Sequence, residues 1–243
     1  MAIPIRFEAS VERIDRCGPD VATFHLLCKE RSPRFKPGQF LHFALDPYDP
    51  SRHWPESRIF SIASGPGRLP GLRLTIARKG RFTSRILDEV AEGRTVWLKG
   101  PYGEFIIAPP PEGGRVVIIA GGTGITPFCA FMEEMLRDHE RYDIPVTVYY
   151  GARTPDLLLY RDLTDMCRRS LSQFRVRYFL ETGCCDSSIP GRLDIDRIVS
   201  DQADPKRCFY YLSGPREMIE AFRLPLGRSH GIPEEQVFID AWE

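Results

Sequence analysis

Three short stretches of this sequence combine residue types that could hold a phosphate or a flat ring. The first, residues 116–127, reads VVIIAGGTGITP: a continuous apolar run leads into three closely spaced glycines and then into a helical pattern. Glycines let backbone N–H groups approach a phosphate closely, and the start of a helix favours negative charge. Pro127 suits this place, because the first helical turn needs no N–H from it. The stretch alone predicts an anion site, and a glycine turn that only ends a buried strand is the alternative.

The second stretch, RIFS at residues 58–61, follows the alternation of a strand. We therefore expect Arg58 and Phe60 on one face and Ile59 and Ser61 on the other. An arginine can clamp a phosphate, an aromatic ring can stack on a flat ring, and a hydroxyl can hydrogen-bond a ring nitrogen. An edge strand with a surface arginine and a core phenylalanine is the alternative.

The third stretch, GRFTS at residues 80–84, opens a helical pattern that runs to Val90, with Thr83 as its expected N-cap. Gly80 permits an unusual turn. The hydroxyls of Thr83 and Ser84, together with helix N–H groups, can hold a pyrophosphate. An ordinary helix cap without a ligand is the alternative.

The elements that must position these residues form two halves. From Phe7 to Phe105, short strands alternate with turns at Gly and Pro, which predicts a six-stranded antiparallel β-barrel. The individual strands expected here are residues 21–28, 39–45, 58–63, 72–78 and 95–98.

After a linker at residues 108–114 (APPPEGG), strands and helices alternate. The expected strands are residues 116–120, 146–150, 174–180, 208–212 and 237–239, and the expected helices are residues 125–137, 159–169, 193–199 and 215–224. This alternation predicts a doubly wound, five-stranded parallel sheet with the glycine turn after its first strand. We predict two domains, residues 1–108 and 109–243.

Composition excludes several classes of protein. Hydrophobic residues make up 42% and charged residues 27% of the chain, as in ordinary globular proteins. The 33 Lys and Arg residues balance the 33 Asp and Glu residues, so bulk charge favours neither a nucleic acid nor a membrane partner. We expect no signal peptide and no membrane span, and hence a cytoplasmic protein. Neither the five histidines nor the seven cysteines show metal-ligand spacing, so we expect no metal and reduced structural thiols.

Taken in order, the motifs closely resemble those of the ferredoxin–NAD(P)H reductase family of flavoproteins, including its flavin reductase and oxygenase-reductase branches. RIFS matches the flavin motif R-x-[YF]-S, and GRFTSRIL matches the flavin pyrophosphate motif. GPYGEF (100–105) matches the strand that closes the barrel, GGTGITP the nicotinamide-nucleotide loop, and LSGPREM (212–218) the C-G-P-x-x-M segment. The resemblance covers nearly all 243 residues.

The resemblance implies roles by position. Arg58 would hold a flavin phosphate, Phe60 would pack against the isoalloxazine, and Ser61 would lie near N5, the hydride acceptor. Phe60 stands where relatives more often have Tyr, and it lacks the hydroxyl that would hydrogen-bond the ribityl chain. The other residues expected to contact the flavin are Ile59, Thr75, Ile76, Ala77, Gly80, Arg81, Phe82, Thr83 and Ser84. Those expected to hold the dinucleotide are Gly121, Gly122, Thr123, Gly124 and Thr126, with Gly214 and Pro215 beside the nicotinamide.

Three departures from the family pattern refine these roles. Ser213 replaces the usual Cys before Gly-Pro, so a small polar group, not a thiol, would sit by the nicotinamide. Asp240-Ala241-Trp242 matches an acid–x–aromatic ending, by which Trp242 would cover the flavin and Asp240 would relay protons. A final strand whose Trp242 simply packs is the alternative. Glu181 replaces a Ser-Arg pair that binds the 2′-phosphate of NADP, which favours NADH, whereas the nearby Arg153 favours NADPH.

The implied protein is an NAD(P)H-dependent flavoprotein reductase that binds FAD and passes electrons to a separate ferredoxin- or oxygenase-type acceptor. A flavin reductase that releases reduced flavin, and a non-catalytic dinucleotide-binding subunit, are the alternatives, and FMN could replace FAD. We expect a monomer. A basic cluster around the flavin phosphates could also meet an acidic partner; its members are Arg73, Arg78, Lys79, Arg81 and Arg85.

Overall fold

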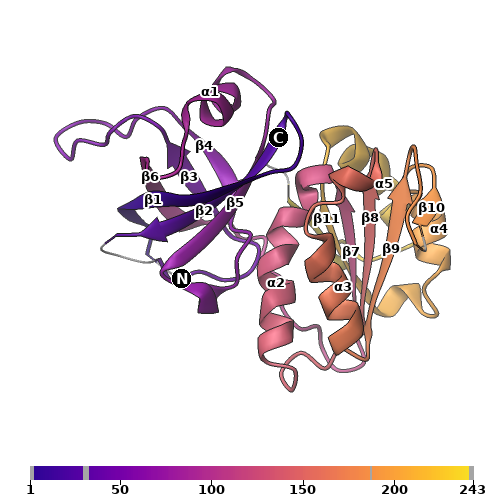
Figure 1. The fold of residues 1–243 in the computed structure, drawn as a ribbon. Coiled ribbons are helices and arrows are strands. Elements are labelled where there is room, and N and C mark those ends of the chain that lie inside the picture. Colours follow the sequence, from indigo (N-terminus) through magenta and orange to yellow (C-terminus); the bar gives the residue numbers. More distant parts are fainter. Residues whose placement is uncertain (1–2, 30–32, 187, 241–243) are drawn as a thin grey trace. The chain divides into compact units, whose positions relative to one another are not determined.

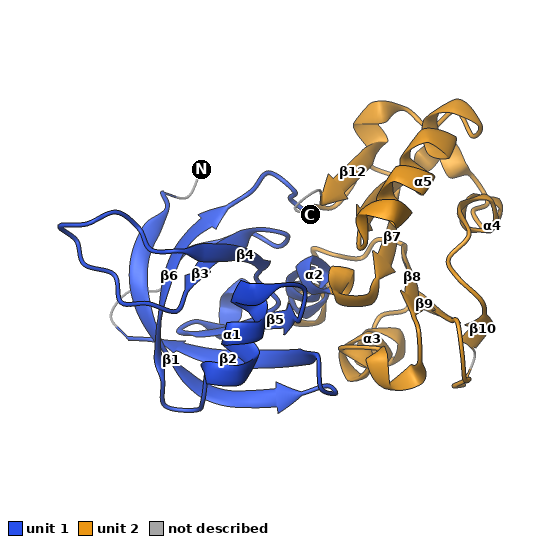
Figure 2. Cartoon of the chain, turned by 90° about the horizontal axis from the view of Figure 1, so that it is seen from above, with its two compact units in different colours: residues 1–106, 126–134 blue, residues 107–125, 135–243 orange. Residues whose placement is uncertain are grey.

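The computed structural model describes residues 3–29, 33–186 and 188–240 (Figure 1). Backbone contacts divide the chain into two units (Figure 2): residues 1–106 with 126–134, and residues 107–125 with 135–243. The predicted functional division at residue 108 stays a prediction.

The first unit is built on a six-stranded antiparallel sheet. Its strands are β1 (Ile5–Arg16), β2 (Val21–Cys28), β3 (Phe40–Ala44), β4 (Ser57–Ser61), β5 (Gly71–Ala77) and β6 (Thr95–Tyr102). They pair in the order β4-β3-β6-β1-β2-β5. Just beyond β4, the Ala63 N–H donates to the Arg73 carbonyl of β5 at 2.8 Å, so the two edges of the sheet nearly meet. The predicted six-stranded antiparallel barrel is confirmed.

Side chains that point into the barrel form a single core. On β3, Leu41 and Phe43 are fully buried, as strand alternation requires of one face. The helix α1 (Arg81–Glu89) adds Phe82 and Ile86 to the same core. The core therefore holds the start of α1 against the barrel wall.

The second unit is a parallel sheet with helices on both faces. Its strands are β7 (Arg115–Gly121), β8 (Val146–Ala152), β9 (Phe174–Leu180), β10 (Ser188–Pro190), β11 (Cys208–Ser213) and β12 (Val237–Asp240), in the order β10-β9-β8-β7-β11-β12. The longer helices of the alternating half are α2 (Thr126–Arg137), α3 (Arg161–Ser170), α4 (Ile195–Ser200) and α5 (Arg216–Arg228). Val117 and Ile119 share a core with α4 and α5. On the opposite face, the Tyr178 hydroxyl lies 2.6 Å from that of Thr164 on α3.

The doubly wound parallel sheet is confirmed, with one strand more than the five predicted. The additional strand, β10, is an edge strand of three residues that ends at Pro190. Three residues are too few to show strand periodicity, so the pattern of the sequence misses it.

Helix α5 extends past its predicted end at Leu224. Pro225 lies inside the helix, where a proline normally stops the pattern. The helix continues because Leu226 is fully buried, and because the Ser229 N–H closes the last turn by donating to the Pro225 carbonyl. None of the helices that the structure describes is long and apolar enough to cross a membrane.

Candidate functional site

The RIFS stretch lies on β4, at one end of the strand order of the barrel sheet. Phe60 stands opposite Leu41 of β3 and packs against the barrel core. Arg58 has an exposed side chain that pairs with Glu56 at 3.1 Å. An edge strand with a surface arginine has the same geometry, so the flavin roles of Arg58, Phe60 and Ser61 stay predictions.

The structure brings the RIFS and GRFTS stretches together. The Arg58 guanidinium lies over the Phe82 ring, 5.1 Å from its centroid. Phe82 is the second residue of α1, and the first N–H groups of a helix have no intrahelical partners. A cation and the start of a helix therefore lie side by side, which is the chemistry of an anion site.

Thr83 does not cap α1 as predicted. The helix begins at Arg81 with Gly80 in the cap position, and Thr83 belongs to the first turn. Its hydroxyl accepts hydrogen bonds from the Lys79 and Gly80 N–H groups at 2.8 and 3.0 Å and donates to the Gly80 carbonyl at 3.0 Å. Because the hydroxyl is used inside the turn, the backbone is what the turn offers to a ligand. A Cβ on Gly80 would meet no described atom within 4 Å, so there is room beside this backbone.

The three candidate flavin-contacting residues on β5 have buried or half-buried side chains, and their contact with a flavin stays a prediction. Ile76 is fully buried in the barrel core. Thr75 is also buried, and its hydroxyl lies 2.8 Å from that of Thr23. Ala77 is half-buried. The side chain of Ile76 is therefore committed to packing.

Most of the predicted basic cluster is engaged in ion pairs. Arg78 pairs with Asp20 and Asp88 at 3.1 and 2.8 Å. Arg85 pairs with Glu89 at 2.9 Å and Asp46 at 3.5 Å. Hydrogen bonding from Arg78 is the main cause that lowers the pKa of the exposed Asp88 carboxyl. These neighbouring acids weaken the case for the cluster as a docking surface for an acidic partner.

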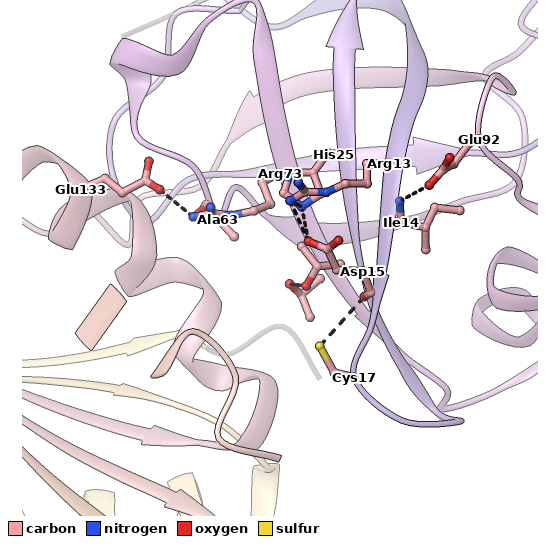
Figure 3. A network of polar contacts seen from close by, with 11 residues as sticks. Arg13, Ile14, Asp15, Cys17, His25, Ala63, Arg73, Glu92 and Glu133 are labelled. Atoms are coloured by element: carbon pink, nitrogen blue, oxygen red, sulfur yellow. Dashed lines mark hydrogen bonds and ion pairs between the residues drawn. The ribbon is translucent and has the colours of Figure 1, made fainter. Parts of the chain in front are cut away.

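An acidic residue that sequence reasoning missed organises the turn after β4. Glu133 of α2 accepts hydrogen bonds from the Gly65 N–H at 2.7 Å, from Nε of Arg68 at 2.9 Å and from a guanidinium nitrogen of Arg73 at 2.8 Å. Only 9% of the Glu133 side chain and 14% of the Arg73 side chain are exposed. Arg73 also donates to the Ala63 carbonyl at 2.6 Å (Figure 3). The carboxylate thus binds three donors at once, all within the first unit.

A second cluster of polar side chains, also drawn in Figure 3, links β1 to β2. Asp15 lies 2.9 Å from Arg13 and 2.7 Å from His25. Burial raises the pKa of Asp15, but hydrogen bonds and charge from His25 and Arg13 outweigh it, so the net shift is downward. This cluster has no ligand role in our predictions.

The glycines of the loop that follows β7 differ in their surroundings. A Cβ on Gly124 would lie 2.2 Å from the Ser213 carbonyl oxygen, and one on Gly121 would lie 2.9 Å from Cδ of Pro215, so these two glycines allow close packing. Gly122 differs: its φ is +54°, and a Cβ there would meet no atom of the described chain within 4 Å. The packing alternative therefore accounts for Gly121 and Gly124, and Gly122 is where a ligand could approach.

The remaining residues predicted to hold the dinucleotide lie around this loop. Thr123 is half-buried, and Thr126, the first residue of α2, is buried. Gly214 has a φ of +156° and is half-buried, and Pro215 is exposed at the start of α5.

Two predicted catalytic residues of the second unit meet. Ser213 ends β11 and stands in register with Asp240 at the end of β12. The Ser213 hydroxyl donates a hydrogen bond to Oδ2 of Asp240 at 3.0 Å.

Burial raises the pKa of Asp240 to about 6, although the hydrogen bond from Ser213 lowers it in part. Oδ1 of Asp240 is buried without a hydrogen-bond partner in the described chain. A buried carboxyl that titrates near neutral pH can take up or release a proton. Trp242 lies outside the described residues.

The predicted selectivity residues lie at the ends of neighbouring strands. Glu181 follows β9, and Arg153 follows β8. Glu181 pairs with Arg192 at 2.9 Å, a partner that sequence reasoning missed. In the sequence, this ion pair is indicated only by the position of Arg192 shortly after the short strand β10.

Comparison with known proteins identifies similar chains. The family model described as "Oxidoreductase NAD-binding domain" matches residues 118–223. Over 86% of its length the chain is 28% identical to the reductase component of propane 2-monooxygenase from Mycolicibacterium smegmatis. Over 98% of its length it is 31% identical to the same component from Rhodococcus jostii. The chain spans 59% and 64% of these two relatives.

The fold is also that of solved structures. A ferredoxin NADP+ reductase from Neisseria gonorrhoeae, solved with bound FAD and NADP, superposes with a TM-score of 0.78 at 19% identity. The match covers 97% of this chain and 98% of that one. The antiparallel barrel and the doubly wound parallel sheet thus have the fold of this reductase, and the sequence is similar to reductase components of a monooxygenase.

Proposed function

We propose that this chain takes electrons from NADH or NADPH, holds them on bound FAD and passes them to a separate oxygenase- or ferredoxin-type protein. Two relatives that are 28% and 31% identical are named reductase components of a monooxygenase, which supports this function. FAD, when bound, accepts two electrons from a nicotinamide and can release them one at a time.

The observation that carries the proposal is the position of Arg58 over Phe82 at the start of α1. The exposed pair of Arg58 with Glu56 contributes at most about 1 kcal/mol to stability, so the guanidinium can turn to a phosphate at little cost. Charge-assisted bonds to a phosphate are stronger. The N–H groups that open α1 and the room beside Gly80 fit the flavin phosphates.

Residues of the second unit fit the nicotinamide donor. The backbone of Gly122 would face the dinucleotide pyrophosphate, since this glycine alone in the loop 121–124 has both a left-handed φ and room for a ligand. Ser213 would orient the Asp240 carboxyl through the 3.0 Å hydrogen bond. Asp240, with a pKa of about 6, would hold a proton on the acid side of neutrality and release it above.

Flavin content tests the proposal. We expect the purified protein to be yellow, to bleach with NADH or NADPH in the absence of air, and to lose flavin affinity about tenfold or more in Arg58→Ala. Arg85→Ala is the matched control, because Arg85 also lies at α1 but is paired with Glu89 and Asp46. Equal flavin binding in both variants would contradict the role of Arg58.

The acceptor is tested by mixing the reduced protein with a ferredoxin, an oxygenase component and free flavin. Faster reoxidation by a protein acceptor than by free flavin is expected. A reduced flavin that leaves the protein would instead support a flavin reductase.

We also propose a cytoplasmic location. The seven cysteines are odd in number and lack metal-ligand spacing, which favours reduced thiols, and disulfides are rare in the reducing cytosol. We expect seven titratable thiols in protein denatured directly from cells, and a smaller number would contradict this location.

A further inference from the structure

The backbone that follows Ser61 is fixed at each of its next two residues. The Ile62 N–H donates to the Gln39 carbonyl at 2.9 Å. The Ala63 N–H donates to the Arg73 carbonyl of β5 at 2.8 Å, and both Ile62 and Ala63 are fully buried. The chain therefore leaves β4 along one defined course, and Ser61 stands at the start of that course.

The Arg73 side chain holds the same segment from β5 (Figure 3). Its Nη2 donates to the Ala63 carbonyl at 2.6 Å and to Oε1 of Glu133 at 2.8 Å, and its Nε donates to that carbonyl at 3.2 Å. Its backbone N–H donates to the hydroxyl of the buried Ser64 at 3.1 Å. Hydrogen bonds from a charged donor are strong where water has little access, so Arg73 restrains residues 63 and 64 together.

Glu133 restrains the next residue from helix α2. Its Oε2 accepts a hydrogen bond from the Gly65 N–H at 2.7 Å, while its Oε1 accepts from Arg73. A Cβ on Gly65 would lie 3.1 Å from Cβ of Glu133 and 3.6 Å from the Ala130 carbonyl oxygen. The glycine therefore lets the helix approach the turn closely. Glu133, Arg73 and Gly65 together form a clamp on the segment after Ser61.

We propose that the clamp positions Ser61 for flavin reduction; this rests on the proposed flavoprotein function. The Ser61 hydroxyl is predicted to lie near N5 of the flavin, and the clamp fixes the backbone directly after it. Misplacement of a reacting group by about 1 Å can lower a rate about 100-fold. The clamp residues bind the protein's own backbone, so their role is to position Ser61.

The clamp is separate from the groups proposed to hold the flavin phosphates. Arg58 has other partners, because it pairs with Glu56 and lies over Phe82 at the start of α1. Loss of the clamp is therefore expected to change the placement of the flavin ring more than the affinity for flavin.

Stopped-flow reduction of Glu133→Gln tests the positioning role. An amide offers one acceptor oxygen in place of two, so it cannot serve both Arg73 and Gly65 as the carboxylate does. We expect the rate of flavin reduction at saturating NADH or NADPH to fall about tenfold or more, while the dissociation constant of the flavin changes less than about threefold. The visible absorption bands of the bound flavin are expected to shift, because the surroundings of the ring change.

Arg68→Ala is the matched control. Arg68 binds the same carboxylate at 2.9 Å, but its side chain is 64% exposed, so the pair contributes little. We expect this variant to keep the reduction rate and the flavin spectrum of the wild type.

Hydrogen exchange of the purified protein provides a readout that needs no turnover. The Ala63 and Gly65 amides are expected to exchange about tenfold faster in Glu133→Gln than in the wild type, and at the wild-type rate in Arg68→Ala. Arg73→Lys keeps the charge but loses the planar fork, so exchange is expected to lie between these two limits. Unchanged exchange in Glu133→Gln would show that the carboxylate does not hold the segment.

Val11→Ala separates positioning from stability. Val11 is buried in the barrel core on β1, so its truncation lowers stability without removing a clamp contact. We expect it to leave the reduction rate and the flavin spectrum unchanged. A loss of rate as large as that in Glu133→Gln would overturn the inference. Wild-type protein that binds no flavin would contradict the proposed function, whereas normal flavin reduction in Glu133→Gln and Arg73→Lys would contradict only the positioning role.

Discussion

The Asp240 carboxyl places a proton-binding group with a pKa of about 6 at the end of β12. Its Oδ2 receives a hydrogen bond from Ser213, and its Oδ1 is buried with no partner among the described residues. A buried carboxylate oxygen without a donor destabilises the ionised form, whereas a protonated carboxyl avoids part of that cost. The stability of the fold is therefore coupled to the proton at this residue.

We expect Asp240→Asn to gain stability relative to the wild type as the pH rises from about 4 to about 6. The folded pKa of about 6 exceeds the ordinary 3.8, so the folded protein binds this proton more tightly than the unfolded chain does. The protonated Asp240 therefore adds to the free energy of unfolding of the wild type. This contribution is fully present below the ordinary pKa, is lost as the pH rises to the folded pKa and stays lost above it. It amounts to at most about 3 kcal/mol, at about 1.4 kcal/mol per pKa unit. Urea unfolding of both proteins from pH 4 to pH 8 measures the difference.

Ser213→Ala serves as the control for this titration. Because the hydrogen bond from Ser213 lowers the pKa of Asp240, its removal is expected to move the upper end of the pH window to a higher value. A stability difference between wild type and Asp240→Asn that is independent of pH would show that Asp240 is not the titrating group.

Among the elements, α2 is held in place by a charged residue, Glu133, in addition to its apolar face. The Glu133 carboxylate accepts hydrogen bonds from Gly65, Arg68 and Arg73, and so it links this helix to the turn after β4. With 9% of its side chain exposed, the carboxylate depends on these donors for its solvation. The pair with Arg73 is therefore more sensitive to loss of one partner than the exposed pairs along α1 are.

We expect Glu133→Gln to lower the free energy of unfolding by about 2–3 kcal/mol, because it leaves the largely buried Arg73 without its counter-charge. Glu89→Gln is the matched control: it also removes a helix carboxylate that pairs with an arginine, but this pair is exposed, so the expected loss is below about 1 kcal/mol. Chemical unfolding at low and high salt measures both. Losses of equal size would contradict the assigned importance of Glu133.

How well the sequence predicts an interaction depends on how many residues separate its two partners along the chain. The glycine loop and RIFS could be found because their residues are contiguous, and the longer strands because their patterns are regular. Thr83 was misplaced because a hydroxyl inside the first turn resembles a cap in the sequence. Glu133 and Arg73 are 60 residues apart, and Glu181 and Arg192 are 11 apart, so only the folded chain brings these pairs together.

For the whole molecule, the course of the chain between the two units matters most. The chain passes from the first unit to the second after residue 106, returns for residues 126–134 and leaves again at Met135. Helix α2 therefore contributes to both units, and neither unit consists of one continuous segment. Because helix formation is cooperative, loss of α2 in one unit is expected to remove it from the other, so we expect the two units to unfold together.

We expect one cooperative unfolding transition in calorimetry, with equal calorimetric and van't Hoff enthalpies. Cavity-forming variants in the two cores, Phe43→Ala and Ile119→Ala, are expected to lower the same transition, since both side chains are fully buried. Two separate transitions, each moved by only one variant, would contradict this.

The return of residues 126–134 to the first unit also constrains how proteins of this architecture can be recombined. A chimera joined at the linker near residue 108 would exchange the helix that carries Glu133 while keeping the barrel that carries Arg73. The protein from which the second half is taken would then need an acidic residue at the position equivalent to Glu133. Compatibility of halves in this architecture is thus expected to depend on one matched charge, in addition to the site where the sequences are joined.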